Sequence, residues 1–191
     1  GVKLEQVNDA LITRNRFDLT SGGNWFSSQY HIYLNESSGF QIEGNELTSQ
    51  YTDVPSVGVL VSESGYNDNE VYKNKLSNLQ YGCLGLGQNR NLEPIGSEEL
   101  AGLEFLCNEN TNNRFIDETF AGSNLGHGCK LLQGTNQEPA GNVFSSNGSP
   151  VVYHLNSTVQ AYMEYWYDAN ATGQTPNLVT GNLQPIGLNV G

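Results

Sequence analysis

The chain has 191 residues, which is enough for one domain with a sizeable core. Charged residues make up only 15% of it and 22 residues are glycine, a composition that favours turns and strands over helices. The net charge of −12, with only eight Lys and Arg, argues against nucleic acids and anionic membrane surfaces as partners. We therefore expect a single globular domain over residues 1–191.

The first predicted element is a short amphipathic helix over residues 2–16. Its apolar residues Val2, Leu4, Val7, Ala10 and Leu11 recur near spacings of three and four. The polar run at residues 21–24 ends it. This helix would cover one face of the β-sheet predicted to follow.

Most of the remaining chain reads as short strands separated by polar loops. Residues 40–43 and 46–51, joined by Gly44-Asn45, predict a tight hairpin. Residues 108–150 read mostly as loop, with a short strand near 129–133. The other predicted strands cover residues 25–34, 57–61, 70–72, 79–86, 103–107, 151–167 and 183–190.

This succession of elements predicts an α+β fold, in which a helix packs on an antiparallel sheet with long irregular loops. No internal repeat is recognised in the chain. The strongest strand signal is the alternation of apolar and polar residues from Val159 to Tyr167.

No constellation typical of an enzyme stands out. The histidines His31, His127 and His154 lack a nucleophile motif, and their spacing does not favour a metal site. Glu104 and Glu164 are the best candidates for the two acids of a glycoside hydrolase, against the simpler interpretation of exposed carboxylates on an acidic protein. We expect a protein that is not an enzyme.

Two other features suggest ligands. Aromatic residues Tyr162, Tyr165, Trp166 and Tyr167 could form a face that stacks on sugar rings, as in a secreted carbohydrate-binding module or adhesin. The simpler interpretation, which we favour, is a sheet with core on one side and loop cover on the other. Asp168, Asn170 and Thr172 match the first half of a calcium-binding loop. Val179 occupies the position where the closing glutamate should stand, so a simple turn is the alternative.

Three cysteines occur, Cys83, Cys107 and Cys129, without a C-x-x-C pair. The missing pair argues against a zinc or thioredoxin-like site, and the odd count permits one disulfide plus one free thiol. We favour an exported protein with one disulfide over a protein of a reducing interior. The pairing Cys107–Cys129 would close the intervening loop.

Four segments in order carry a family resemblance: residues 46–51 (ELTSQY), 81–85 (YGCLG), 103–107 (LEFLC) and 159–173 (VQAYMEYWYDANATG). The series resembles the W-type minor pilins of type IV pili and, more distantly, the J-type pseudopilins of type II secretion. It covers roughly residues 40–173. Cys129 has no place in the pattern.

The resemblance implies a pilin fold and a function in priming or capping a pilus-like filament. Its partners would be other minor pilins and the major pilin, at the cell surface or in the periplasm. The helix at 2–16 would continue a hydrophobic, membrane-inserted helix that is missing from this chain. The family's cysteines correspond to Cys83 and Cys107, so the resemblance implies that these two form a disulfide.

Overall fold

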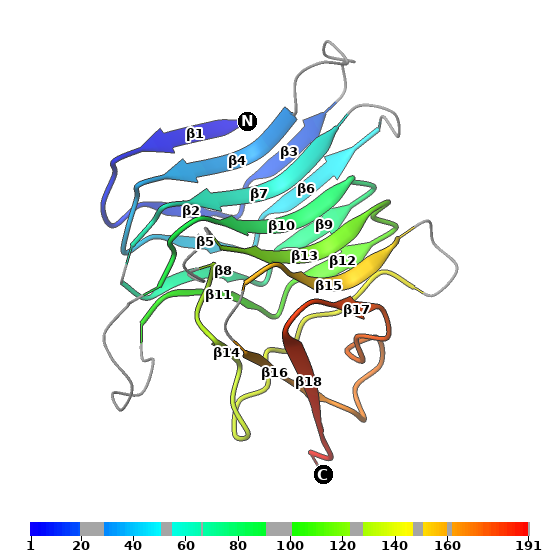
Figure 1. The fold of residues 1–191 in the computed structure, drawn as a ribbon. Coiled ribbons are helices and arrows are strands. Elements are labelled where there is room, and N and C mark those ends of the chain that lie inside the picture. Colours follow the sequence, from blue (N-terminus) through cyan, green and yellow to red (C-terminus); the bar gives the residue numbers. More distant parts are fainter. Residues whose placement is uncertain are drawn as a thin grey trace.

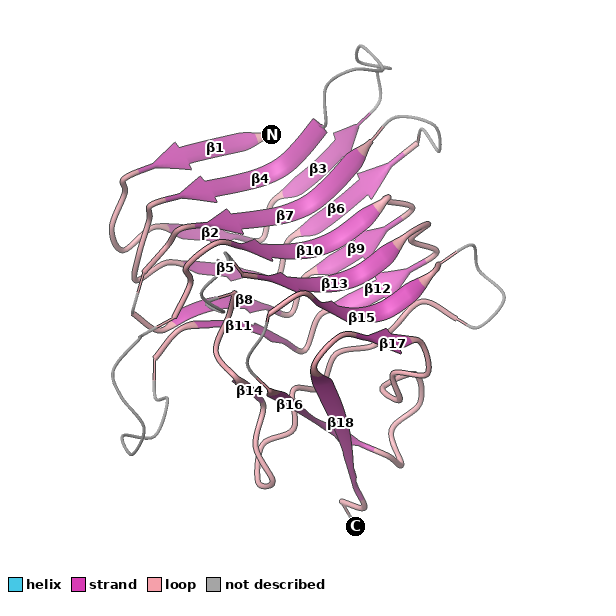
Figure 2. Ribbon diagram, viewed as in Figure 1, coloured by secondary structure: helices cyan, strands magenta, loops and turns pink. Residues whose placement is uncertain are grey.

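The computed structural model is built from short strands, and none of the residues it describes lies in a helix (Figure 2). The described part comprises residues 1–19, 29–50, 55–65, 67–90, 101–122, 128–146, 151–159 and 162–190. Over these ranges there is no helix long and apolar enough to cross a membrane. Every pairing between named strands is parallel. The predicted α+β fold with an antiparallel sheet is therefore wrong.

The strands wind into successive coils, so that each strand pairs with the strand one turn earlier and one turn later (Figure 1). This arrangement is a parallel β-helix. The long sheet has seven strands: β1 (Val2–Glu5), β4 (Gln29–Asn35), β7 (Ser56–Ser62), β10 (Tyr81–Leu86), β13 (Ile116–Ala121), β15 (Tyr153–Ser157) and β17 (Val179–Thr180).

Three smaller sheets complete the coils. The second sheet contains β2 (Leu11–Thr13), β5 (Gln41–Glu43), β8 (Asn69–Tyr72) and β11 (Leu103–Leu106). The third sheet contains β3 (Arg16–Leu19), β6 (Glu46–Ser49), β9 (Lys75–Ser77) and β12 (Glu109–Thr111). The C-terminal sheet contains β14 (Leu132–Gln133), β16 (Met163–Asp168) and β18 (Leu183–Leu188).

A ladder of asparagines holds the corner between the second and third sheets. Its members follow one another at separations of 30, 29, 34 and 34 residues. Within the ladder each side-chain oxygen accepts hydrogen bonds from the preceding asparagine, as Asn74 Oδ1 does from the backbone and side chain of Asn45 at 3.0 and 2.9 Å. The ladder consists of Asn15, Asn45, Asn74, Asn108 and Asn142.

The residue before each ladder asparagine has a positive φ: Arg14 55°, Gly44 65°, Lys73 54°, Cys107 54° and Gly141 69°. This left-handed residue turns the chain sharply from one sheet to the next. The predicted hairpin at Gly44-Asn45 is thus a corner between β5 and β6, which lie in different sheets. The expectation of no internal repeat is wrong, because an apolar residue stands three positions before the first four ladder asparagines, at Ile12, Ile42, Val71 and Phe105.

The predicted helix over residues 2–16 is also wrong. Residues 2–16 instead form β1, β2 and the start of β3. Gln6, Asp9 and Arg14 have φ values of 55°, 57° and 55°, which no right-handed helix permits. The apolar spacing arises because Val2 and Leu4 on β1 and Ile12 on β2 all face one core.

The core fills the inside of the coils with stacked apolar side chains. Adjacent coils place like residues above one another, as in the row Ile12, Ile42, Val71 and Phe105. Phe105 and Phe120 stack with ring centroids 5.3 Å apart. Long-range pairing thus supplies both the hydrogen bonds and the hydrophobic burial of this fold.

Candidate functional site

The outer face of the long sheet carries a row of large apolar residues. Paired positions on five adjacent strands are occupied by Tyr30, Val57, Tyr81, Ile116 and Tyr153. A second row beside it contains Lys3, Tyr33, Leu60, Leu84, Thr119, Asn156 and Thr180. We call these two rows, with the flanking residues Phe115 and Val152, the outer band.

An irregularity in the strands turns the first row outward. In β4, His31 and Ile32 are both buried, so the alternation of inward and outward side chains slips by one position. The same happens in β13 and β15, where Asp117 with Glu118 and His154 with Leu155 are buried pairs.

Contacts indicate that the outer band faces away from the core, although Val57 and Leu60 are covered by their neighbours and are only 3% and 6% exposed. The core cluster includes Ile32 and Val59 but neither Val57 nor Leu60. Tyr30, Phe115 and Tyr153 are 38%, 42% and 36% exposed. Exposed rings therefore stand on this face at β4, β15 and just before β13.

The rings of the outer band lie in pairs. Tyr30 and Tyr33 have centroids 5.5 Å apart, and Tyr81 and Phe115 have centroids 5.8 Å apart. Lys3 is the one charged member of the two rows, and its ammonium lies 5.5 Å from the Tyr33 centroid and 2.8 Å from the Glu5 carboxylate. The surface therefore offers ring faces and hydroxyl groups with almost no net charge.

A cleft of about 450 Å³ opens elsewhere, on the outer face of β8 and β11. Glu70 and Glu104 occupy paired positions there, and Glu104 forms a 2.9 Å ion pair with Lys130. Burial raises the pKa of the Glu104 carboxyl, while Lys130 opposes the shift. Tyr72 and Cys107 also line this cleft.

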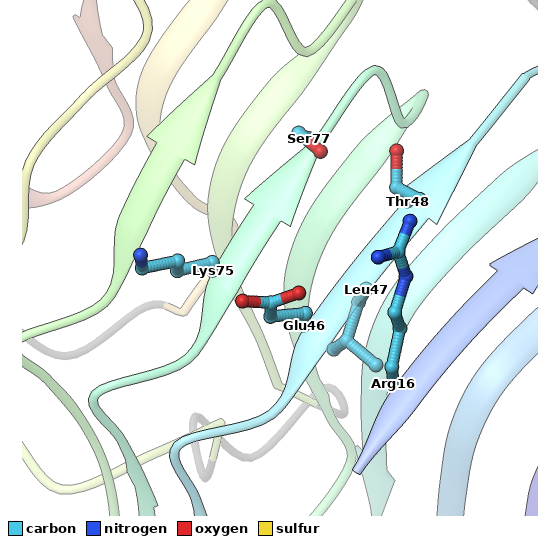
Figure 3. A pocket seen from close by; sticks show the side chains of 6 residues that line it. All are labelled: Arg16, Glu46, Leu47, Thr48, Lys75 and Ser77. Carbon is cyan, nitrogen blue, oxygen red and sulfur yellow. The ribbon is translucent and has the colours of Figure 1, made fainter. Parts of the chain in front are cut away.

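A shallower hollow of about 320 Å³ lies on the outer face of the third sheet (Figure 3). Arg16, Glu46 and Lys75 alternate in charge across three paired strands. Arg16 forms a 3.0 Å ion pair with Asp18 on its own strand. Alternating charge across strands is the ordinary cross-strand pairing of an exposed sheet and identifies no ligand.

Two acids lie inside the coils rather than on a surface. The Asp117 carboxylate accepts hydrogen bonds from the Ser145 backbone and hydroxyl at 2.9 and 2.8 Å and from Asn113 at 3.0 Å. Burial raises its pKa to about 6. Burial, and then the charge of Asp117, raise the pKa of Glu118 well above its usual range.

The residue types of a catalytic triad occur together in Ser145, His154 and Asp117, but their hydrogen bonds differ from those of a triad. The Ser145 hydroxyl donates to Asp117, and the His154 Nδ1 accepts from the Asn177 backbone at 3.2 Å. The His154 ring stacks on Phe144 at 5.3 Å and burial lowers its pKa. With the hydroxyl bonded to the acid, this arrangement does not activate a nucleophile.

The other described histidine and the two predicted acids likewise form no catalytic arrangement. His31 is buried with its ring nitrogens 3.1 and 3.0 Å from the Val57 and Thr48 carbonyls, and His127 lies outside the described residues. Glu104 and Glu164 lie in different sheets. Glu164 accepts a 3.1 Å hydrogen bond from the Trp166 indole, so it too has a structural partner.

The aromatic residues near position 165 do not share one face. Tyr165 is buried, and its hydroxyl accepts a 2.8 Å hydrogen bond from Asn142. Trp166 is only partly exposed, while Tyr162 is 55% exposed. The predicted sugar-stacking platform is therefore divided between the core and the surface.

At the predicted calcium loop, the Asn170 backbone donates to Asp168 Oδ1 at 2.8 Å, and Gly173 has a φ of 80°. These features describe a strand-end turn. Among the described residues no group of three or more His, Cys, Asp or Glu side chains could hold a metal ion. Calcium binding by Asp168, Asn170 and Thr172 stays a prediction.

No disulfide joins Cys83 to Cys107, and all three cysteines are free. Cys83 lies within the core on β10, and Cys107 is exposed at the corner after β11. Cys129 is buried and lies against Gly85.

Sequence reasoning did not find the tyrosines of the outer band. They become visible only when the strands of the long sheet are aligned by their parallel register. Each then stands two positions before a buried residue of the long sheet, as Tyr30 does before Ile32 and Tyr153 before Leu155. Comparison with protein-family models, curated proteins and solved structures gives no match.

Proposed function

We propose that this protein binds carbohydrate on the outer band. The observation that carries the proposal is the row of Tyr30, Tyr81 and Tyr153 at paired positions on strands of one rigid sheet. Aromatic rings bind sugars by burying the apolar faces of sugar rings, while tyrosine hydroxyls hydrogen-bond to sugar hydroxyls. A flat sheet keeps the rings in fixed positions, which lowers the entropy cost of binding.

Charge supports a neutral ligand. The chain carries a net charge of −12, and the two rows contain only Lys3 as a charged side chain. An acidic polysaccharide would be repelled by the protein as a whole. The outer band also contains the partly exposed Asn156, which can hydrogen-bond to uncharged hydroxyl groups.

Filament assembly, the function expected from the pilin resemblance, depends on an N-terminal helix. Residues 2–16 form strands, so we favour the carbohydrate-binding alternative. A location in the periplasm or at the cell surface, and the absence of enzymatic activity, stay predictions.

A glycan array followed by affinity gel electrophoresis tests the proposal. Replacing Tyr81 by alanine should weaken binding about tenfold, because the loss of one stacked ring costs about 1.4 kcal/mol. Tyr162→Ala is the matched control, since it removes a tyrosine that is 55% exposed but lies outside the long sheet. A failure of the wild-type protein to bind any glycan would refute the proposal.

A further inference from the structure

The spacing of the tyrosines in the outer band restricts the kind of carbohydrate. Tyr30, Tyr81 and Tyr153 lie on β4, β10 and β15. One strand separates each tyrosine from the next, and these intervening strands β7 and β13 carry Val57 and Ile116 at the paired positions. The tyrosines therefore recur at every second strand.

Neighbouring strands in a sheet are about 4.8 Å apart, so the tyrosines recur about every 10 Å along the axis of the coils. Two sugar units of a fully extended β-1,4-linked chain span nearly the same length. In such a ribbon, alternate sugar rings present the same face. A ring on every second strand can therefore stack on every second sugar.

The smaller residues between the tyrosines fit this alternation. Val57 is buried to 3% exposure between its neighbours, whereas Tyr30 is 38% exposed. The row thus alternates in residue type between tyrosine and a smaller aliphatic side chain, and Tyr81, Ile116 and Tyr153 continue this alternation, with Tyr81 and Ile116 both partly exposed. An intervening sugar can lie over each aliphatic side chain.

We infer that the ligand is an uncharged, ribbon-like β-1,4-linked glycan that crosses the strands, with one tyrosine for every two sugar units. This inference rests on the proposed function. The row from Tyr30 to Tyr153 covers four strand steps, about 19 Å, so it accommodates about four or five sugar units. A helical α-1,4-linked chain of the same sugar presents no such repeat.

Isothermal titration calorimetry with defined oligosaccharides tests the inference. The probes are cellohexaose, chitohexaose and maltohexaose, and a length series of cellobiose, cellotetraose and cellohexaose, or the corresponding chito-oligosaccharides if chitohexaose is the tighter ligand. We expect at least one β-1,4-linked hexaose to bind tenfold or more tightly than maltohexaose. In the series of that sugar, affinity should rise at least tenfold from the dimer to the tetramer and rise again to the hexamer, because these lengths reach one, two and three tyrosines.

A variant at the end of the row gives a second test. Tyr30→Ala should weaken hexaose binding several-fold and change dimer binding less, because a dimer can stack on Tyr81 or on Tyr153 instead. Tyr162→Ala again serves as the control, and circular dichroism verifies that each variant is folded. If the Tyr30 ring only supports the fold, Tyr30→Ala should weaken hexaose and dimer binding equally.

The outcomes separate the two proposals. Equal binding of maltohexaose and both β-1,4-linked hexaoses, or affinity that does not change with length, overturns the inference and leaves carbohydrate binding intact. Binding only to charged or branched glycans does the same. No binding to any glycan overturns the proposed function and the inference with it.

Discussion

The asparagine ladder provides the sharpest test of the fold, through the substitution Asn74→Ala. The Asn74 side chain accepts two hydrogen bonds from Asn45, at 3.0 and 2.9 Å. It donates two more, to the Ile42 carbonyl at 2.9 Å and to Asn108 Oδ1 at 3.1 Å. Asn74 itself is fully buried, so water cannot replace these contacts.

Alanine at this position leaves the Asn45 backbone N–H and the Ile42 carbonyl without their side-chain partner. A buried polar group left unsatisfied costs about 1–3 kcal/mol, so the two together should cost about 4 kcal/mol. In a chain of this size that corresponds to a Tm about 8–16 °C lower. The positive φ of the preceding Lys73 is a property of its own backbone and is not altered.

The matched control is Asn15→Ala, at the first position of the same ladder. The Asn15 side chain donates to Asn45 Oδ1 and to the Thr13 carbonyl, but it is exposed. Its loss should cost about 1 kcal/mol or less, because water can take over these contacts. Thermal and urea unfolding followed by circular dichroism measure both variants. Equal destabilisation by the two substitutions would refute the ladder as a buried stabilising network.

The internal acids predict that the protein is most stable at low pH. The pKa of Asp117 is raised from 3.8 to about 6, so the folded state binds this proton more tightly than the unfolded state. The resulting contribution to the free energy of unfolding is about 3 kcal/mol. It is complete below the unfolded pKa near 4 and is lost as the pH rises through about 6. Glu118→Gln should raise the Tm at pH 8 more than at pH 4, and a Tm that rises steadily from pH 4 to pH 7 would contradict both expectations. Leu76→Ala, in the core, should cost about 3 kcal/mol in urea unfolding, whereas Leu11→Ala, at a side chain that is 66% exposed, should cost less than about 1 kcal/mol; equal costs would contradict the assignment of Leu76 to the core. Cys107 should be the one thiol that a maleimide labels in the native protein, with three labelled after unfolding; a single thiol after unfolding would instead indicate a disulfide.

Sequence alone determined much of the local structure. Predicted strands at residues 57–61, 70–72, 103–107 and 183–190 overlap β7, β8, β11 and β18. Local composition suffices for these, because β-branched and aromatic residues favour an extended backbone and polar turns interrupt it. The predicted alternation is confirmed for residues 163–166, since Met163 and Tyr165 are buried while Glu164 and Trp166 are partly exposed. The single strand predicted at residues 151–167 is wrong, because β15 and β16 are separate strands in different sheets.

Only the tertiary structure decided how the strands pair. A strand such as β5 bonds to β2 and β8, about 30 residues away on either side, and the residues of β5 do not specify such distant partners. The sharp corner at Gly44-Asn45 fits either a hairpin or a turn between two sheets, and the choice depends on Asn45 contacting Asn15 and Asn74. The outer band has the same origin, because Tyr30, Tyr81 and Tyr153 are separated by dozens of residues in the chain. Parallel pairing brings them onto one face, and that pairing is set by the hydrogen bonds and packing of whole coils.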